Sequence, residues 1–253
     1  MNQAPIFPFG NLLGTILFVL FAELELLGQV THIKQLHYLE PVPILMLIFF
    51  SKRNTKQQKL VLIGLTFCVM GDILLLFSGD TTFMLGTGSF MLGHVFFISS
   101  FSLDISWAFL LFLPSRQKIV RVVLLVAIET IKYFNIYSAW DKIKEDPTTG
   151  FFFVLYGFIM PFSTTSAILR RDDAEGGASA YWKFIIGPFL LLVSDSIIAY
   201  LKFHEHGHLP MSGFLIMITY YVGQTLIFSA SSFNVKKPDN REEATSLLSG
   251  YDQ

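Results

Sequence analysis

Runs of about 20 apolar residues recur along this 253-residue chain, and short polar or charged clusters separate them. A helix of about 20 residues crosses the ~30 Å hydrocarbon core of a bilayer, because each residue adds about 1.5 Å. Strands of a membrane barrel would instead alternate apolar and polar residues. The composition agrees, since 53% of the residues are hydrophobic and 15% are charged, against about 25% charged in soluble domains. The sequence therefore predicts an all-α, polytopic membrane protein.

The apolar runs predict eight transmembrane helices, of which the second is short and carries Pro41 and Pro43. The stretch 104–114 is ambiguous, because it could extend the fourth helix, lie at the membrane interface or belong to a different fifth span. We expect residues 1–233 to form one transmembrane domain and the polar residues 234–253 to form a disordered tail. The predicted spans are 9–28, 36–51, 60–77, 83–103, 118–137, 150–168, 183–202 and 212–233.

Basic residues predict the orientation of the chain. Thirteen Lys and Arg residues follow the even-numbered spans or lie in the tail, and four lie on the opposite side. The positive-inside rule therefore places both termini in the cytosol. We expect no cleaved signal peptide, because the first apolar run lacks a basic start and carries Glu23 and Glu25. The single cysteine, Cys68, excludes an intramolecular disulfide, and the net charge of −1 gives no reason to expect nucleic acid as a partner.

The cytosolic tail contains the sequence EEATSLL, residues 242–248, which resembles an acidic dileucine sorting signal. Such a signal would direct the protein to endolysosomal membranes. The alternative is an ordinary solvated tail without a sorting role.

Three carboxylates are embedded at a common depth. Asp72, Asp195 and Glu129 follow the basic residue at the cytosolic start of their spans by 11 to 13 residues. At about 1.5 Å per residue they lie roughly 17 to 20 Å from the cytosolic edge. Charged residues at such depth normally face the bundle interior and mark a function, so we expect a polar chamber in the luminal half. Polar residues of other predicted spans reach the same layer: His94, Tyr220, Tyr221 and Gln224. The alternative is that these groups only hydrogen-bond one helix to another.

Two other sets of charges have simpler interpretations. Glu129 and Lys132 are separated by three residues on one predicted helix, where they can neutralise each other. Glu23 and Glu25 point to different helix faces, so they cannot both line one cavity well. We expect one of them to lie near the luminal boundary.

The two aspartates occupy similar sequences. Residues 63–72 and 186–195 both read Ile-Gly, six residues, a small residue and Asp, and the offset between them is 123 residues. Because the two spans are four helices apart and parallel, this pattern indicates a 4 + 4 duplication. Asp72 and Asp195 would then face each other across the pseudo-symmetry axis.

The sequence HEHGH, residues 204–208, formally matches the zinc protease pattern H-E-x-x-H. Gly207 and Pro210 place it at a helix end, and no third ligand is evident. We therefore expect a luminal loop that titrates near pH 6.5, and no metal site.

Several motifs together resemble the YhhN family of multi-span membrane proteins. They are GDILLLF (71–77), GHVFFISSF (93–101), VLYGFIM (154–160), GPFLLLVSDSIIAYLKF (187–203) and YYVGQTLI (220–227). The resemblance covers residues 42–230, with Gly223 where alanine is expected. It implies a lysoplasmalogenase, which hydrolyses the sn-1 vinyl ether of a lysoplasmalogen to a fatty aldehyde and glycerophosphoethanolamine or glycerophosphocholine. It also implies catalysis by Asp72 and Asp195 without a metal or organic cofactor, and residence in the endoplasmic reticulum membrane.

The chemistry suits a pair of carboxylates. Vinyl ether hydrolysis begins with proton transfer to the β-carbon and passes through an oxocarbenium ion, as in glycosidases. One aspartate would be the general acid, and the other would stabilise the cation and activate water, but the two roles cannot be assigned from the sequence. Residues that would orient the carboxylates or bind the lysophospholipid are His94, Tyr156, Tyr220, Tyr221 and Gln224.

Two other functions fit the same residues. Midplane carboxylates, a proline within a span and an internal repeat are also features of transporters. A family member without activity could bind lipid and regulate. A hydrolase would release aldehyde in detergent, whereas a carrier needs a membrane gradient, and a lipid-binding regulator would keep its affinity after Asp195→Asn. The sequence leaves a homodimer open.

Overall fold

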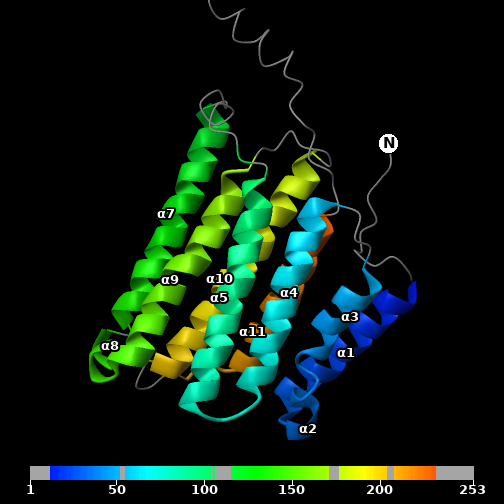
Figure 1. The fold of residues 1–253 in the computed structure, drawn as a ribbon, viewed down its shortest axis with the longest axis vertical. Helices are drawn as coiled ribbons and strands as arrows, with labels where there is room; N and C mark the ends of the chain where they lie inside the picture. Colours follow the sequence, from blue (N-terminus) through cyan, green and yellow to red (C-terminus); the bar gives the residue numbers. More distant parts are fainter. Residues whose placement is uncertain are drawn as a thin grey trace, which may run out of the picture.

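The computed structural model describes residues 12–51, 55–103, 105, 115–138, 140–170, 177–203 and 208–231, and the regular elements in these residues are all helices. Most of them stand upright in one bundle, with α1 and α3 tilted at one side (Figure 1). The helices are α1 (Leu12–Thr31), α2 (Lys34–His37), α3 (Val42–Phe50), α4 (Lys56–Leu75), α5 (Asp80–Ser102), α7 (Ser115–Ser138), α8 (Trp140–Glu145), α9 (Pro147–Ile168), α10 (Gly177–Phe203) and α11 (Ser212–Ala230). The all-α prediction is confirmed.

Within the described residues, six helices are long and apolar enough to cross a membrane: α1, α4, α5, α9, α10 and α11. Each of the eight predicted spans overlaps a helix, and the span 36–51 overlaps the end of α2 and all of α3. Two of these helices, α3 and α7, differ from the six. Helix α3 has nine residues, or about 14 Å, which is about half the hydrocarbon thickness. Helix α7 has 24 residues but is more polar. The protein is therefore a multi-span helical membrane protein, and the count of eight spans stays a prediction.

Two polar residues of α7, Arg121 and Asn135, form hydrogen bonds to neighbouring helices. Arg121 is buried, and its Nη1 donates hydrogen bonds to the carbonyl oxygens of Ile168 at 2.9 Å and Arg170 at 2.8 Å, at the C-terminal end of α9. Toward its other end, Asn135 Nδ2 donates to Ser196 Oγ of α10 at 2.8 Å. Unsatisfied carbonyls at a helix C-terminus favour a cation. Helix α7 is therefore fastened to α9 and α10 by polar contacts.

The pairs α4–α5 and α10–α11 make the most extensive helix contacts among the described residues, and each contains two facing glycines. A Cβ added at Gly64 would lie 3.0 Å from the carbonyl oxygen of Gly93, and the reverse distance is also 3.0 Å. The corresponding distances between Gly187 and Gly223 are 2.9 and 2.8 Å. Small residues allow this close approach of helices, which drives packing where no hydrophobic effect operates between them.

These contacts lie at equivalent places relative to the aspartates. Each aspartate follows the glycine of its helix by eight residues, Asp72 in α4 and Asp195 in α10. On the partner helix the glycine is followed directly by a buried polar residue, His94 in α5 and Gln224 in α11. This equivalence agrees with the predicted duplication for these two helix pairs. The complete 4 + 4 repeat stays a prediction.

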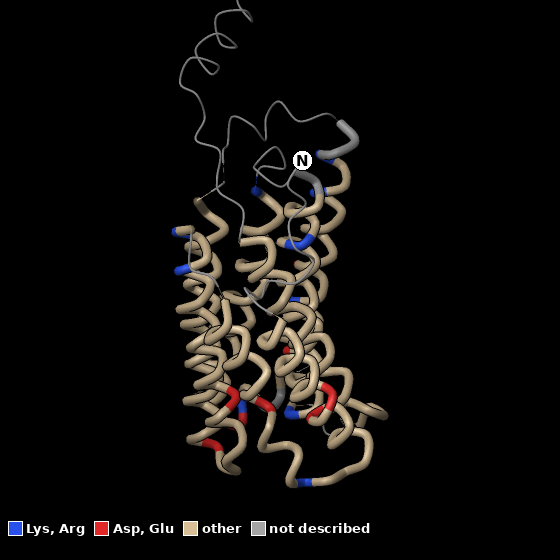
Figure 2. The backbone as a smooth tube through the Cα atoms, turned by 90° about the vertical axis from the view of Figure 1, so that its right-hand side faces the viewer, with Lys and Arg blue, Asp and Glu red and all other residues tan. Residues whose placement is uncertain are grey.

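Charged residues are unevenly distributed along the bundle. In Figure 2, Asp and Glu residues gather in the lower part, while several Lys and Arg residues lie toward the upper end. The cytosolic location of both termini stays a prediction. The stretch 104–114 apart from Ile105, the first four residues of HEHGH and the tail with its dileucine-like sequence lie outside the described residues.

We predict that alanine at a facing glycine destabilises the protein. Gly187→Ala places a Cβ against the backbone of Gly223, and overpacking of this kind costs about 1–3 kcal/mol. Gly88→Ala in α5 is the control, because a Cβ there meets no atom within 4 Å and alanine is the better helix former by about 1 kcal/mol. Thermal unfolding in detergent should show a lower Tm for Gly187→Ala and an equal or higher Tm for Gly88→Ala. Equal Tm values would contradict the close contact.

Candidate active site

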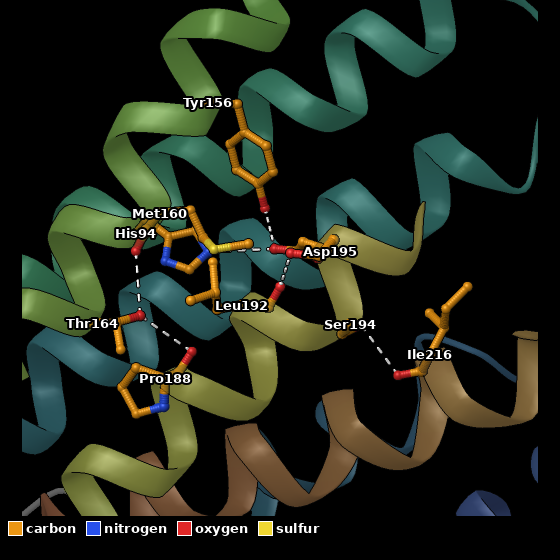
Figure 3. Close-up of polar contacts among 10 residues, drawn as sticks. His94, Tyr156, Met160, Thr164, Pro188, Leu192, Ser194, Asp195 and Ile216 are labelled. Atoms are coloured by element: carbon orange, nitrogen blue, oxygen red, sulfur yellow. Dashed lines mark hydrogen bonds and ion pairs between the residues drawn. The ribbon is translucent and has the colours of Figure 1, made fainter. Parts of the chain in front are cut away.

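Asp195 of α10 lies where α5, α9 and α10 meet. Its Oδ2 accepts a hydrogen bond from the hydroxyl of Tyr156 on α9 and lies 3.8 Å from Nε2 of His94 on α5. Figure 3 shows both side chains pointing toward this carboxylate. The side chain of Asp195 is 16% exposed, so solvent or substrate can reach it. A carboxylate, a hydroxyl and an imidazole within contact distance can hold and move a proton.

His94 is buried at this junction. Its ring packs edge-on against Phe97 and Tyr156, with centroids 5.8 and 5.9 Å away. Its Nδ1 has no hydrogen-bond partner among the described residues. The imidazole therefore directs one nitrogen toward Asp195 and keeps the other in an apolar environment.

Asp72 of α4 lies deeper and is 2% exposed. Its Oδ2 accepts a hydrogen bond of 2.9 Å from the hydroxyl of Tyr220 on α11. The preceding residue, Gly71, leaves room for the ring of Phe90, since a Cβ there would lie 2.7 Å from it. The small residue before Asp195 has another role, because the Ser194 hydroxyl donates to the carbonyl of Ile216 at 3.1 Å.

The two aspartates share a negatively charged surrounding. Asp72 interacts electrostatically with Asp195 and also with Glu40 and Glu25. Within the described part of the chain, neither aspartate is paired with a lysine or arginine. Among the described residues, the two carboxyls therefore lie in the interior without a lysine or arginine side chain paired to them.

Two cavities meet at Asp195. Cavity A has about 540 Å³ of empty space, including its open mouth, and lies between α4, α5, α9 and α10. Its lining is almost entirely apolar: Leu75, Phe83, Met84, Thr87, Phe90, Thr149, Phe152, Phe153, Tyr156, Asp195, Ile198, Ala199 and Phe203. Cavity B has about 320 Å³ and lies between α7, α9 and α10, lined by Lys132, Asn135, Phe153, Tyr156, Gly157, Met160, Pro161, Leu192, Asp195, Ser196 and Ala199.

The predicted site residues divide into two groups. Asp195 and Tyr156 line both cavities, and His94 contacts both residues. Asp72 and Tyr220 form a second, buried pair that lines neither cavity, so the predicted chamber opens onto Asp195 rather than onto both aspartates. The side chain of Gln224 is fully buried, lies beside Cys68, and has no hydrogen-bond partner within the described residues.

Tyr221 follows Tyr220 on α11 and is turned about 100° from it around the helix. Its hydroxyl donates to the carbonyl oxygen of Glu40 at 2.9 Å, and its ring packs against Phe18 of α1. Tyr221 therefore contacts a cluster of acidic residues near α1 and α2, which contains Glu25 and Glu40, and does not line the cavities.

That cluster contains Glu40, which the sequence analysis missed. Glu25 is fully buried, accepts a hydrogen bond from Gln29 Nε2 at 2.6 Å, and lies 4.0 Å from His37 Nδ1. Glu23 is exposed, so the two glutamates point to different faces as predicted. The signal for Glu40 was its position directly before Pro41, at the start of a short helix packed on the bundle.

The predicted pair of Glu129 and Lys132 is confirmed, because the Lys132 ammonium donates to Glu129 Oε2. The structure adds that Lys132 reaches into cavity B, while Glu129 is 48% exposed.

The fold and the site define a class: a multi-span helical membrane protein with one buried aspartate and a second, partly exposed aspartate on the wall of an apolar cavity. A family model, the YhhN family, matches residues 36–231. The chain therefore belongs to the YhhN family, and the match includes α3 to α11 but not α1. No curated protein and no solved structure matches the chain.

We predict that the protein becomes easier to unfold as pH rises, because Glu40 loses its proton. Glu40 lies in the turn between α2 and α3, outside the six apolar spans, and burial, followed by the charge of Glu25, raises its pKa from 4.5 to about 8. Between these two values the folded protein holds a proton that the unfolded chain releases, so unfolding becomes more favourable as pH rises. Thermal unfolding should show Glu40→Gln above wild type in Tm at pH 8 and close to it at pH 4.5. Glu23→Gln at the exposed neighbouring site should leave the pH dependence unchanged, and the same dependence in Glu40→Gln as in wild type would contradict the assignment.

Proposed function

We propose that the protein is a lysoplasmalogenase, which hydrolyses the sn-1 vinyl ether of alkenyl-glycerophosphoethanolamine or alkenyl-glycerophosphocholine. The observation that carries the proposal is the position of Asp195, a partly exposed carboxyl on the wall of an otherwise apolar cavity, with Tyr156 and His94 beside it. Family membership supports the same reaction class.

Cavity A suits an alkenyl chain. Its phenylalanine, leucine, isoleucine and methionine side chains leave the carboxyl of Asp195 and the hydroxyls of Tyr156 and the two threonines as its polar side-chain groups. Each methylene transferred from water into such surroundings contributes about 0.8 kcal/mol. A long chain therefore binds with its polar end directed to Asp195, which places the vinyl ether at the carboxyl.

The proposed reaction starts with proton transfer from the Asp195 carboxyl to the β-carbon of the vinyl ether. The carbon–carbon double bond supplies the electron pair, and the α-carbon becomes an oxocarbenium ion that the new carboxylate stabilises. Water then adds to the α-carbon and returns a proton to the carboxylate. The hemiacetal collapses to the fatty aldehyde and the glycerophospho alcohol, so one water is consumed and the acid is regenerated.

The neighbouring groups prepare Asp195 for both steps. Asp72 interacts electrostatically with Asp195 and lines neither cavity. Tyr156 fixes the carboxyl through its hydroxyl. His94 Nε2, at 3.8 Å, has room to orient the attacking water against the carboxylate. Asp195 thus touches the substrate, whereas Asp72 acts from a buried position outside the two cavities.

We also propose that the enzyme lies in the endoplasmic reticulum membrane with cavity A open toward the lumen. The basis is the predicted orientation, in which the cavity end of α4, α5, α9 and α10 is opposite the basic loops.

We predict that Asp195→Asn lowers the rate of aldehyde release by about 100-fold or more, the usual contribution of a general acid. Asp72→Asn should lower it less, by about tenfold, because it alters a buried hydrogen bond to Tyr220 rather than the proton donor. The assay uses purified protein in detergent with alkenyl-lysophosphatidylethanolamine. Asp146→Asn is the control, since Asp146 is the exposed N-cap of α9 and asparagine caps equally well.

Full activity in Asp195→Asn with an intact fold would contradict the proposed acid. A wild-type protein that releases no aldehyde at any pH, yet moves lysolipid across vesicle membranes, would favour a transporter. Retained lysolipid affinity without either activity would favour a regulatory lipid-binding protein.

A further inference from the structure

The two cavities that meet at Asp195 differ in chemistry. Cavity A offers an apolar wall, whereas cavity B adds Lys132, Asn135 and Ser196. The substrate class named above, on which this inference rests, also has two chemically different parts on either side of the vinyl ether. One is a hydrocarbon chain and the other is a glycerol phosphate.

Lys132 is the one cation among the described residues that line either cavity. Its side chain is 10% exposed, whereas that of its partner Glu129 is 48% exposed. The ammonium leans from α7 across to α9, where it lies 5.0 Å from the ring centroid of Phe158. Although its partner Glu129 is exposed, Lys132 itself is largely buried and lines cavity B.

The location of Lys132 allows access from the membrane interface. Exposed aromatic residues follow it on α7 and α8: Tyr133, Tyr137 and Trp140. Such residues mark the level of the lipid head groups. Five residues of helix separate Lys132 from Tyr137, or about 7.5 Å, so a phosphate at the interface needs only a short path into cavity B.

We propose that cavity B binds the phosphate of the lysolipid, with Lys132 as its cationic ligand and Glu129 as the competing anion. The alkenyl chain then occupies cavity A, and the vinyl ether lies between them at Asp195. A lysine ammonium acts as a point charge toward phosphate, so it fixes the position of the phosphate and leaves the rest of the head group free.

Lys202 is a second lysine, located beside cavity A, and serves as the comparison for Lys132. It lies 4.7 Å from the ring centroid of Phe83, which lines cavity A, and pairs with Asp80 at 3.3 Å. This pair is more exposed, at 39% for Lys202 and 86% for Asp80. A phosphate at Lys202 would place the head group at the apolar cavity and the chain beside Lys132, which inverts the chemical match.

The test compares two substrates that differ only in phosphate: alkenyl-lysophosphatidylethanolamine and the alkenylglycerol with the same chain. Lys132→Met should raise KM for the phosphorylated substrate about tenfold or more, the scale of one lost charge-assisted contact, and leave KM for alkenylglycerol unchanged. Lys132→Arg should retain most of the affinity. Lys202→Met should leave both KM values unchanged.

Glu129→Gln separates a binding role from a structural one. Removing the competing anion should lower KM for the phosphorylated substrate, in the direction opposite to Lys132→Met, whereas loss of a structural ion pair would impair both variants. The double variant Glu129→Gln with Lys132→Met leaves no unpaired charge and so guards against misfolding. It should show the same raised KM as Lys132→Met.

Equal effects of Lys132→Met on both substrates, or a KM effect confined to Lys202→Met, would overturn the proposal. Ligand-induced shifts in Tm keep this result separate from failure of the hydrolase assignment. The saturated alkyl-lysophosphatidylethanolamine, which has no vinyl ether, should raise the Tm of wild type more than alkylglycerol does, and Lys132→Met should abolish the difference. If wild type releases no aldehyde, this difference still decides the phosphate site, and its absence in wild type would overturn the proposal.

Discussion

The close approach of two pairs of glycines fixes the positions of both aspartates. Gly64 faces Gly93, and Gly187 faces Gly223, with each Cβ position within 3.0 Å of the partner's carbonyl oxygen. In a bilayer the lipid is as apolar as the side chains, so packing of this kind must hold helices together. The contact also sets the register of the two helices. Since each aspartate lies eight residues after its glycine, a slip of one residue would turn the carboxyl by about 100° away from its present neighbours.

The same motif lies in two different surroundings. In α4 the aspartate is buried beneath Phe90 and bonded to Tyr220, whereas in α10 it borders two cavities and is bonded to Tyr156. The cavities border Asp195 because gaps remain where α10 faces α5, α7 and α9, whereas Tyr220 of α11 bonds the carboxyl of Asp72 in the interior. The carboxyl of Asp195 therefore borders open space whereas that of Asp72 is enclosed, although both come from equivalent sequence positions.

Much of the fold and part of the site follow from the sequence. Apolar length predicts the helices, and depth along each helix predicts that Asp72, Asp195 and His94 share a layer, because rise per residue depends only on backbone geometry. Which face a side chain presents depends on how helices rotate against each other. For that reason Tyr156 rather than Tyr220 bonds Asp195, and Tyr221 turns away from the cavities. The sequence does not predict the cavities either, because a cavity is the small volume that remains after many side chains have packed.

Helix α7 is the most polar of the long helices, and its polar residues contact both its neighbours and cavity B. Its low hydropathy would disfavour a lipid-exposed span. Two of its polar side chains are instead hydrogen-bonded inside the bundle: Arg121 donates to a carbonyl at the end of α9, and Asn135 donates to Ser196 of α10. A polar helix fastened in this way can carry a cation into the bundle without leaving backbone groups of its neighbours unsatisfied. Its third polar contact, between Lys132 and Glu129, is of a different kind, because it joins two groups on the same helix and bonds no other helix. Lys132 of this pair lines cavity B, which Asp195 also borders.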